Sequence, residues 1–197
     1  MKLLIASNNA HKIKEIKAIV GDFFEEVLSL REAGVDVDVE ENGMTFAENA
    51  QIKAEAILNL TGYAALADDS GLMVDALGGE PGVYSARYAG VHGDDHANNM
   101  KMIENLKDVP KNKRGAQFVS SIALARPGQP IVITTGICRG EITYEARGEN
   151  GFGYDPYFLP EGMTQTFAEL SAEIKNAISH RAMALENLKT VLAEENK

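Results

Sequence analysis

The first twenty residues combine an apolar run with a helical pattern, and this pair constrains the fold more than any other feature. Residues 2–7 are an apolar run closed by a polar turn, which is typical of a short buried strand. Residues 11–20 repeat apolar side chains at i, i+3 and i+7, on one face of a helix. A strand, a short polar turn and a helix in this order open an α/β unit. The turn between them, residues 7–12, is a common place for anion binding.

The remaining periodicities predict a mixed sheet flanked by helices. Strand patterns cover residues 27–30, 63–67, 118–125, 131–138 and 157–159, with residues 72–77 extending the second of them. Helical patterns begin at Thr45, at Asp94 or Asp95, and at Ser179. The two long β-rich runs are joined by about five residues and predict a hairpin. Because βα units and a hairpin occur together, we predict an α/β fold with a mixed β-sheet.

Two segments carry the spacing of a helix start. Thr45 and Glu48 have the spacing of a capping box, and Gly62 is a typical residue to end the helix that follows. Residues 166–170 repeat the same spacing.

The length and charge of the chain exclude some functions. Its 197 residues and 21.3 kDa suit one domain, or two lobes that share a sheet, and 45% of the residues are apolar. The 19 basic and 29 acidic residues leave a net charge of −10. This balance argues against a protein that coats nucleic acid or an anionic membrane, since phosphate contact needs a basic face. A small anionic substrate needs only a local cationic pocket.

The single cysteine and the N-terminus bear on the compartment. Cys138 alone excludes an internal disulfide and a multi-cysteine zinc site, and inside a strand pattern it is typical of a small core residue. The N-terminal apolar run of four residues is shorter than a signal peptide or a membrane span requires. We therefore expect a cytoplasmic protein with neither a signal peptide nor a membrane span.

Two adjacent acids are the first candidate for chemistry. The apolar residues 63–67 run directly into Asp68 and Asp69, so we expect both carboxylates at the carboxyl end of a strand, where open α/β sheets bind ligands. Adjacent carboxylates repel unless a cation or a proton relieves them, and Mg²⁺ suits such a pair. The alternative is a turn capped by Asp68 with a solvated Asp69. A second pair, Glu40 and Glu41, is typical of a solvated loop and gains meaning only if the fold brings it near Asp69.

The cationic candidates are Lys12, Lys175, His180 and Arg181. Lys12 belongs to the first strand-to-helix turn, where backbone N–H groups and Ser7 can also bind phosphate. His180 and Arg181 follow Ser179 at a predicted helix start. A surface role is the alternative for each, and the absence of an HExxH motif leaves a zinc site without support.

A glycine-rich loop supplies the remaining candidate. Residues 151–156 read Gly-Phe-Gly-Tyr-Asp-Pro, which combines aromatic faces, a flexible backbone and a carboxylate, as base stacking and base-edge hydrogen bonds require. An ordinary turn with a core tyrosine is the alternative. The chain has no GxGxxG, GxxxxGK[ST] or GxSxG motif, so neither a dinucleotide fold, a Walker ATPase nor a serine nucleophile is indicated.

Taken together, six segments resemble the inosine/xanthosine triphosphate pyrophosphatase family, which removes deaminated purine nucleotides from the nucleotide pool. They are residues 7–12 with Glu15, 43–50, 67–72, 81–87, 151–156 and 178–181. Each motif alone is weakly specific, but all six occur in the order of the family and span nearly the whole chain.

The resemblance implies a single domain over residues 1–197, with an elongated mixed sheet, two lobes and a substrate cleft between them, as a homodimer. It implies Mg²⁺-dependent hydrolysis of dITP, ITP or XTP to the monophosphate and pyrophosphate. By the same resemblance, Asp69 is the catalytic base and a metal ligand, and Glu40 or Glu41 is the second acidic metal position. The implied substrate-binding residues are Ser7, Asn8, Asn9, Ala10, His11, Lys12, Ser70, Phe152, Gly153, Tyr154, Asp155, Lys175, His180 and Arg181.

Base selection calls for a group that recognises the 6-oxo edge. A donor aimed at O6 would reject adenine, which presents a donor there. We hypothesise that His180 and Arg181 read this edge and that Tyr154 or Phe152 stacks on the base.

Two other functions fit parts of the pattern. One is a Maf-like nucleotide pyrophosphatase acting on modified pyrimidines or standard nucleotides. The other is a nucleotide-binding regulatory module without turnover, against which the intact pair Asp68 and Asp69 argues, since binding alone needs no water-activating acid.

Overall fold

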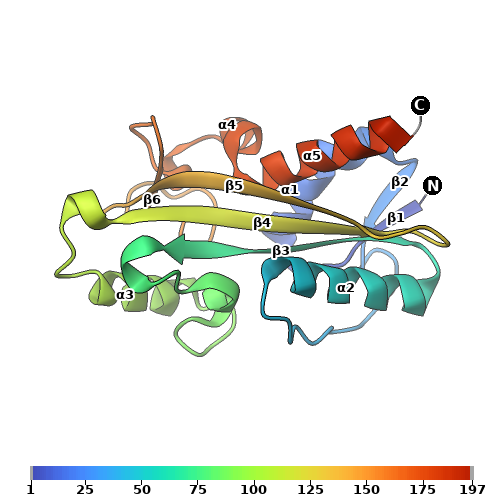
Figure 1. Cartoon of the computed structure of the whole chain (residues 1–197), viewed down its shortest axis with the longest axis horizontal. Helices are drawn as coiled ribbons and strands as arrows, with labels where there is room; N and C mark the ends of the chain where they lie inside the picture. The colour runs from blue at the N-terminus through green and yellow to red at the C-terminus, as the bar shows by residue number, and fades with distance from the viewer. Residues whose placement is uncertain (1, 196–197) are drawn as a thin grey trace. The chain divides into compact units, whose positions relative to one another are not determined.

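The computed structural model describes residues 2–195, so positions 1, 196 and 197 of the predicted domain lie outside the described residues. Its sheet has the strand order β2-β1-β3-β4-β5-β6 (Figure 1). The strands are β1 (Lys2–Ile5), β2 (Glu26–Ser29), β3 (Ala64–Val74), β4 (Gly115–Ala125), β5 (Val132–Ile142) and β6 (Phe158–Pro160). β1 pairs in parallel with β2 and β3, whereas β5 and β6 are antiparallel. The predicted mixed α/β sheet is confirmed.

Helices connect and cover these strands. They are α1 (Ala10–Val20), α2 (Phe46–Thr61), α3 (Asp95–Asn105), α4 (Ala172–Ile178) and α5 (His180–Glu195), with 3₁₀ turns at Gly21–Phe23, Asp75–Leu77, Gly82–Arg87, Lys111–Lys113 and Phe167–Glu169. The sequence does not predict α4, because its seven residues are too few to display an apolar period. Within residues 2–195, none of the helices is both long and apolar enough to cross a membrane.

The helix starts follow the turn chemistry. Thr45 and Glu48 form the predicted capping box of α2, and Gly62 ends that helix in the left-handed conformation at φ 72°. Asp94, one of the two predicted candidates, caps α3. The second capping-box spacing, at Thr166, opens only the 3₁₀ turn Phe167–Glu169.

The chain divides into two compact units. The first contains residues 2–69, 120–136 and 180–195, and the second contains residues 70–119 and 137–179. Strands β3, β4 and β5 each contribute residues to both units.

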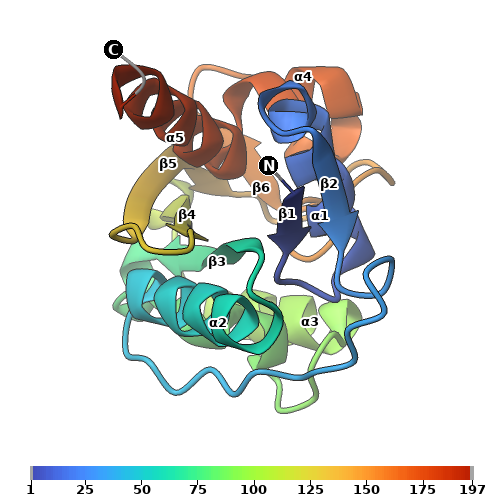
Figure 2. The same cartoon turned by 90° about the vertical axis from the view of Figure 1, so that its right-hand side faces the viewer.

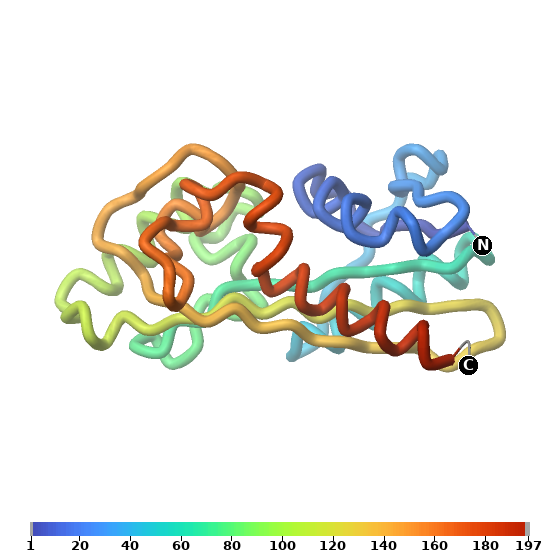
Figure 3. The backbone as a smooth tube through the Cα atoms, turned by 90° about the horizontal axis from the view of Figure 1, so that it is seen from above, coloured from blue at the N-terminus to red at the C-terminus, as the bar shows by residue number. Residues whose placement is uncertain are grey.

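The first unit has three layers. Because side chains alternate along a strand, Leu3 and Ile5 of β1 face the core shared with α1 and α5, whereas Leu4 faces the core shared with α2. Figure 2 shows α2 on one side of these strands and α1 with α5 on the other. Helix α5 also runs along the β4–β5 hairpin (Figure 3), where the Thr134 hydroxyl donates to the Ala184 carbonyl over 2.8 Å.

The second unit has a core of aromatic side chains. The ring of Phe118 lies 4.7 Å from that of Phe158 and 5.8 Å from that of Phe167, measured between centroids. Cys138 is buried in this core, as predicted for a small core residue. Burial raises the pKa of its thiol to about 11, which disfavours the thiolate that a nucleophile would need.

One strand prediction is wrong in a way that matters for the site. Asp68 and Asp69 lie in the middle of β3 rather than at its carboxyl end. β3 continues because Leu72 and Val74 are fully buried in the core of the second unit. The pairing with β1, however, stops where Ala6 donates to the Leu66 carbonyl. The two acids therefore lie just beyond the carboxyl end of β1.

Candidate functional site

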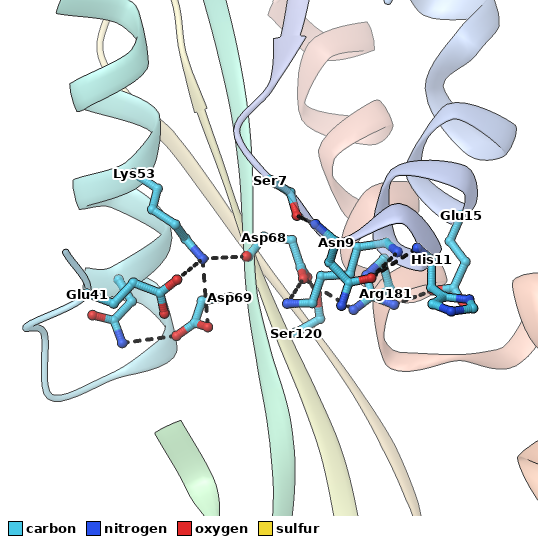
Figure 4. A network of polar contacts seen from close by, with 12 residues as sticks. Ser7, Asn9, His11, Glu15, Glu41, Lys53, Asp68, Asp69, Ser120 and Arg181 are labelled. Atoms are coloured by element: carbon cyan, nitrogen blue, oxygen red, sulfur yellow. Dashed lines mark hydrogen bonds and ion pairs between the residues drawn. The ribbon is translucent and has the colours of Figure 1, made fainter. Parts of the chain in front are cut away.

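Asp68 is the centre of a buried polar network in the first unit (Figure 4). Its Oδ2 lies 2.7 Å from Lys12 Nζ on α1 and 3.2 Å from Arg181 Nη2 on α5. Its Oδ1 accepts a hydrogen bond from the Ser120 hydroxyl on β4 over 2.6 Å. Arg181 also donates through Nη1 to Glu15 on α1. One carboxylate thus links two helices to the central strands.

The charges in this network stabilise one another. Burial raises the pKa of the Asp68 carboxyl, but Arg181 and Lys12 outweigh burial, so the pKa lies well below its ordinary value. Burial lowers the pKa of the Arg181 guanidinium, but Asp68 and Glu15 raise it, and the net shift is upward. Asp68 is therefore ionised and matched by cations, as a structural anchor requires.

Asp69, the next residue, has different surroundings. Its Oδ2 accepts from Asn49 Nδ2 over 3.0 Å, and its Oδ1 lies 3.9 Å from Lys53 Nζ. Burial raises the pKa of the Asp69 carboxyl, and the nearby charge of Glu41 adds to this effect. Lys53 and Lys12 lower that pKa but do not cancel the effect of burial, so the net shift is upward. A carboxylate with a raised pKa binds a proton more readily, which is what a general base needs.

Lys53 joins this acid to the second acidic pair. Its Nζ donates over 2.8 Å to Glu41 Oε1 and over 2.9 Å to the backbone carbonyl of Asp68. Glu41 is thereby the member of the pair that the fold brings near Asp69, whereas Glu40 is exposed on the loop. The sequence leaves open whether Glu40 or Glu41 is the second acidic metal position, and in the structure Glu41 is the one that shares Lys53 with Asp69.

The oxygens around Lys53 suit a hard cation. Carboxylate oxygens of Glu41 and Asp69 and the backbone carbonyl of Asp68 all face the Lys53 ammonium group, which occupies the place that a bound cation would take. Mg²⁺ is held in proteins by one or two carboxylates together with water and phosphate oxygens, so the donor set fits it. Within residues 2–195 no cluster of three or more His, Cys, Asp or Glu side chains is arranged to hold a metal, so the fit rests on two carboxylates.

A tight loop holds Glu41 at this position. The Gly43 N–H donates to Asn49 Oδ1 over 2.8 Å, and Met44 N–H donates to Glu48 Oε2 over 2.7 Å. A Cβ on Gly43 would lie 2.7 Å from Asn49 Oδ1 and 2.8 Å from Glu48 Cβ. Asn49 therefore fixes both Asp69 and the loop that carries Glu41.

The turn before α1 uses its own polar side chains to cap the helix. Asn9 caps the helix, and its Oδ1 accepts from the N–H groups of His11 and Lys12. Ser7 Oγ accepts from the Asn9 N–H over 3.1 Å. Residues 8–11 are exposed, whereas Lys12 points to Asp68.

The glycine-rich loop lies in the second unit. Asp155 Oδ2 accepts from the Phe152 N–H over 2.9 Å and from Lys175 Nζ over 2.6 Å, and that Nζ lies 4.8 Å from the centroid of the Phe152 ring. The Tyr154 hydroxyl donates to the Ser85 carbonyl, and its ring belongs to the hydrophobic core. Phe152 is half-buried and Tyr154 is buried, so Phe152 is the more accessible of the two predicted stacking rings.

The predicted residues thus fall into two groups, each described within its own unit. The first unit contains Asp69, Glu41, the turn 7–12, His180 and Arg181, and the second contains Ser70, the loop 152–155 and Lys175. His180, the first residue of α5, is buried, and Ser70 is half-buried directly after Asp69 on β3.

Sequence analysis did not single out Lys53 or Ser120 as site residues. Asn49 and Lys53 stand four residues apart on α2, so they share the helix face that bears buried Ala50 and Ala54. Two polar side chains on an otherwise apolar helix face could have marked Asn49 and Lys53 as candidate site residues. Ser120 carries no such signal, because its role depends on the pairing of β3 with β4.

The chain is similar to known proteins over nearly its whole length. The model of the Ham1 family matches residues 3–191. A dITP/XTP pyrophosphatase of Clostridium perfringens is 48% identical over 194 residues, covering 95% of each chain. The solved Ham1 protein of Staphylococcus aureus is 44% identical with a TM-score of 0.88, covering 99% of this chain and 100% of that one. A nucleoside-triphosphatase, dITP/XTP pyrophosphatase, of Mycobacterium abscessus is 46% identical with a TM-score of 0.77, covering 95% and 98%.

A family model that covers nearly the whole chain, and relatives of this identity over nearly their full length, leave one conclusion: the chain belongs to the Ham1 family.

Proposed function

We propose that the chain hydrolyses non-standard purine nucleoside triphosphates (dITP, ITP and XTP) to the monophosphate and pyrophosphate. The observation that carries the proposal is the cluster of Asp69, Glu41 and Lys53. In it Asp69, whose pKa is raised, and Glu41 face the same cationic group. Relatives named dITP/XTP pyrophosphatase support the choice of substrate.

The charge of the substrate explains the first group of residues. A triphosphate carries nearly four negative charges, which cationic groups must neutralise. The exposed turn before α1 offers the Ser7 hydroxyl, and a phosphate there would replace Asn9 Oδ1 as the acceptor of the His11 and Lys12 N–H groups. The Lys12 ammonium pairs with Asp68, so a phosphate would share it with that carboxylate. Asp69 accepts the proton of a water that attacks the α-phosphorus, while pyrophosphate leaves in line. Asn49 holds the Asp69 carboxylate in a fixed orientation for this transfer.

A divalent metal, which we propose to be Mg²⁺, would be held by Asp69 and Glu41. When bound, it neutralises phosphate charge and lowers the pKa of a coordinated water. The Lys53 ammonium pairs with both of these acids, at 2.8 Å from Glu41 and 3.9 Å from Asp69.

The second group is proposed to bind the base. The half-buried Phe152 ring stacks on the purine, and Lys175, held by Asp155, presents a cation beside that ring. The hypothesis that His180 and Arg181 read the 6-oxo edge stays a prediction, and Arg181 also anchors Asp68. If Arg181→Ala left the preference for dITP over dATP unchanged, its role would be confined to that anchor.

The experiment that tests the function is a substrate panel. Pyrophosphate release is measured with dITP, XTP, dATP, dGTP, dCTP and dTTP, each with Mg²⁺ and with EDTA. We expect release from dITP and XTP far above that from the standard nucleotides, and its loss in EDTA. Turnover of pyrimidines instead would favour a Maf-like activity, and tight binding without turnover would favour a regulatory module.

The Gly43 loop gives a prediction about metal dependence. Gly43→Ala places a Cβ against Asn49 and Glu48, so we expect a cost of about 1–3 kcal/mol in unfolding free energy. Because the same loop carries Glu41, the Mg²⁺ concentration for half-maximal activity should also rise. Gly21→Ala is the matched control, since Gly21 has a φ of −54° and a Cβ there meets no atom within 4 Å. Equal metal dependence in both variants would contradict the assignment of Glu41.

We further propose that the protein acts as a homodimer in the cytoplasm, where the nucleotide pool that it would cleanse is found. Light scattering at micromolar concentration tests the dimer, and a monomer mass would contradict it.

A further inference from the structure

The backbone of Gly153 is held at its N–H and at its carbonyl by side chains of one helix. Its N–H donates to Asp95 Oδ2 over 2.8 Å, and its carbonyl accepts from Asn99 Nδ2 over 2.8 Å. Asp95 and Asn99 are four residues apart on α3, so they project from the same face of that helix. Two side chains that stand 54 and 58 positions away in the sequence therefore hold the two peptide groups that flank the Gly153 Cα, one each.

These two side chains are not needed to start α3. The N-cap is Asp94, whose Oδ1 accepts from the Ala97 N–H over 2.9 Å. Asp95 instead directs its carboxylate to the loop, where a hydrogen bond to a charged acceptor is stronger than one between neutral groups.

The orientation of the Asn99 amide is determined by its partners. Its Nδ2 donates both to the Asp95 carbonyl and to the Gly153 carbonyl, over 2.9 and 2.8 Å, and both partners can only accept. Asn99 is 7% exposed, and within residues 2–195 its Oδ1 has no hydrogen-bond partner. An acceptor left unpaired in a buried position costs free energy, so the side chain is retained for what its NH₂ group holds.

The loop between these contacts has little freedom. The preceding N–H, that of Phe152, donates to Asp155, and a Cβ on Gly151 would lie 2.0 Å from Asp155 Oδ2. Gly153 itself has a φ of 61°, a conformation that glycine adopts readily. Asp155 therefore holds one end of the Phe152–Gly153 segment, and α3 holds the other.

We propose that Asp95 and Asn99 are positioning residues that set base selectivity by fixing the backbone of the loop at Gly153, Asp95 through the Phe152–Gly153 peptide and Asn99 through the Gly153–Tyr154 peptide. The proposal rests on the proposed function, in which this loop binds the purine. Selectivity between bases depends on the placement of stacking and hydrogen-bonding groups, so a loosened loop should bind the correct base less well and reject others less well. The acid that takes the proton lies on β3, so the rate of the chemical step should change little.

The test compares two disrupting variants with two controls. Asp95→Ala removes the acceptor for the Gly153 N–H, and Asn99→Asp keeps the side-chain size but faces two carbonyl oxygens with an oxygen. We expect each to raise the KM for dITP and to lower the dITP-over-dATP preference by about three- to tenfold, with kcat within about twofold. Asp95→Asn retains an acceptor oxygen and should restore the preference. Asp94→Ala weakens the start of the same helix but touches no loop residue, so it should leave the preference unchanged.

Amide hydrogen exchange at Gly153 supplies a readout independent of turnover. Its N–H should lose protection in Asp95→Ala and keep it in Asp95→Asn and Asp94→Ala. An unchanged preference in Asp95→Ala and Asn99→Asp, or an equal loss in Asp94→Ala, would overturn the proposal. Absence of dITP and XTP turnover in the wild type would instead overturn the proposed function, while the exchange measurement would still report on the two hydrogen bonds.

Discussion

Asp69→Asn is expected to abolish turnover of dITP while leaving nucleotide affinity within about tenfold. The substitution removes the group that accepts the proton of the attacking water, and general base catalysis contributes about 10²–10⁴-fold to a rate. An asparagine at this position still offers an oxygen to Asn49 Nδ2, so the local geometry is retained. Single-turnover pyrophosphate release and equilibrium binding of dITP, each measured with Mg²⁺, give the two quantities.

The same variant should be at least as stable as the wild type. The folded state raises the pKa of Asp69 above its unfolded value, so the folded protein binds more protons, and stability falls as the pH rises through that range. At neutral pH the ionised carboxylate therefore costs stability, and Asp69→Asn removes this cost. Near-normal rates would exclude Asp69 as the base, and a large loss of stability would show that the carboxylate is a structural anchor instead.

The secondary structure was largely predictable because it depends on local patterns. Apolar periodicity marked β1 and α1, and the Thr45–Glu48 spacing and Gly62 marked the two ends of α2. The helix α4 and the 3₁₀ turns were not predicted, since a few residues give no period to detect. Residues 72–77 were expected to extend the strand of residues 63–67, and β3 does run to Val74, but its unbroken course through the two acids was missed, because it depends on a core that lies far away in the sequence.

The site was predictable only in part, for a related reason. Residue type and motif predicted a role for Asp69, and the resemblance to a family predicted one for the turn before α1; both stay predictions. The proximity of Glu41, rather than Glu40, to Asp69 depends on the position of Lys53, and the contact of Ser120 with Asp68 depends on the partner strand of β3. These are contacts between distant segments, and a single sequence carries no record of them. The sequence also left open the different roles of two adjacent acids, which their buried neighbours decide.

Asp68→Asn is expected to lower the free energy of unfolding by about 3–5 kcal/mol. Asp69→Asn, by contrast, is expected to leave that free energy unchanged or to raise it. The Asp68→Asn variant leaves Arg181 and Lys12 without the carboxylate that each now pairs with, and Arg181 is 1% exposed. Removing one member of a buried ion pair leaves its partners with less compensating charge, here that of Glu15 for Arg181, and this costs far more than breaking an exposed pair. Urea denaturation at neutral pH measures the loss, and Glu104→Gln, in an exposed pair with Lys107, should change stability little.

The pH dependence and a double variant identify the cause of that loss. Because folding lowers the pKa of Asp68, its contribution is fully present above the ordinary value of 3.8 and is lost as the pH falls through the lower folded value. The gap between wild type and Asp68→Asn should therefore stay constant from neutral pH to about pH 4 and narrow below it. Asp68→Asn combined with Arg181→Met should cost less than the sum of the two single variants, since the two side chains interact. Additive losses would show that Asp68 and Arg181 stabilise the fold separately, and that the lowered pKa does not arise from their pairing.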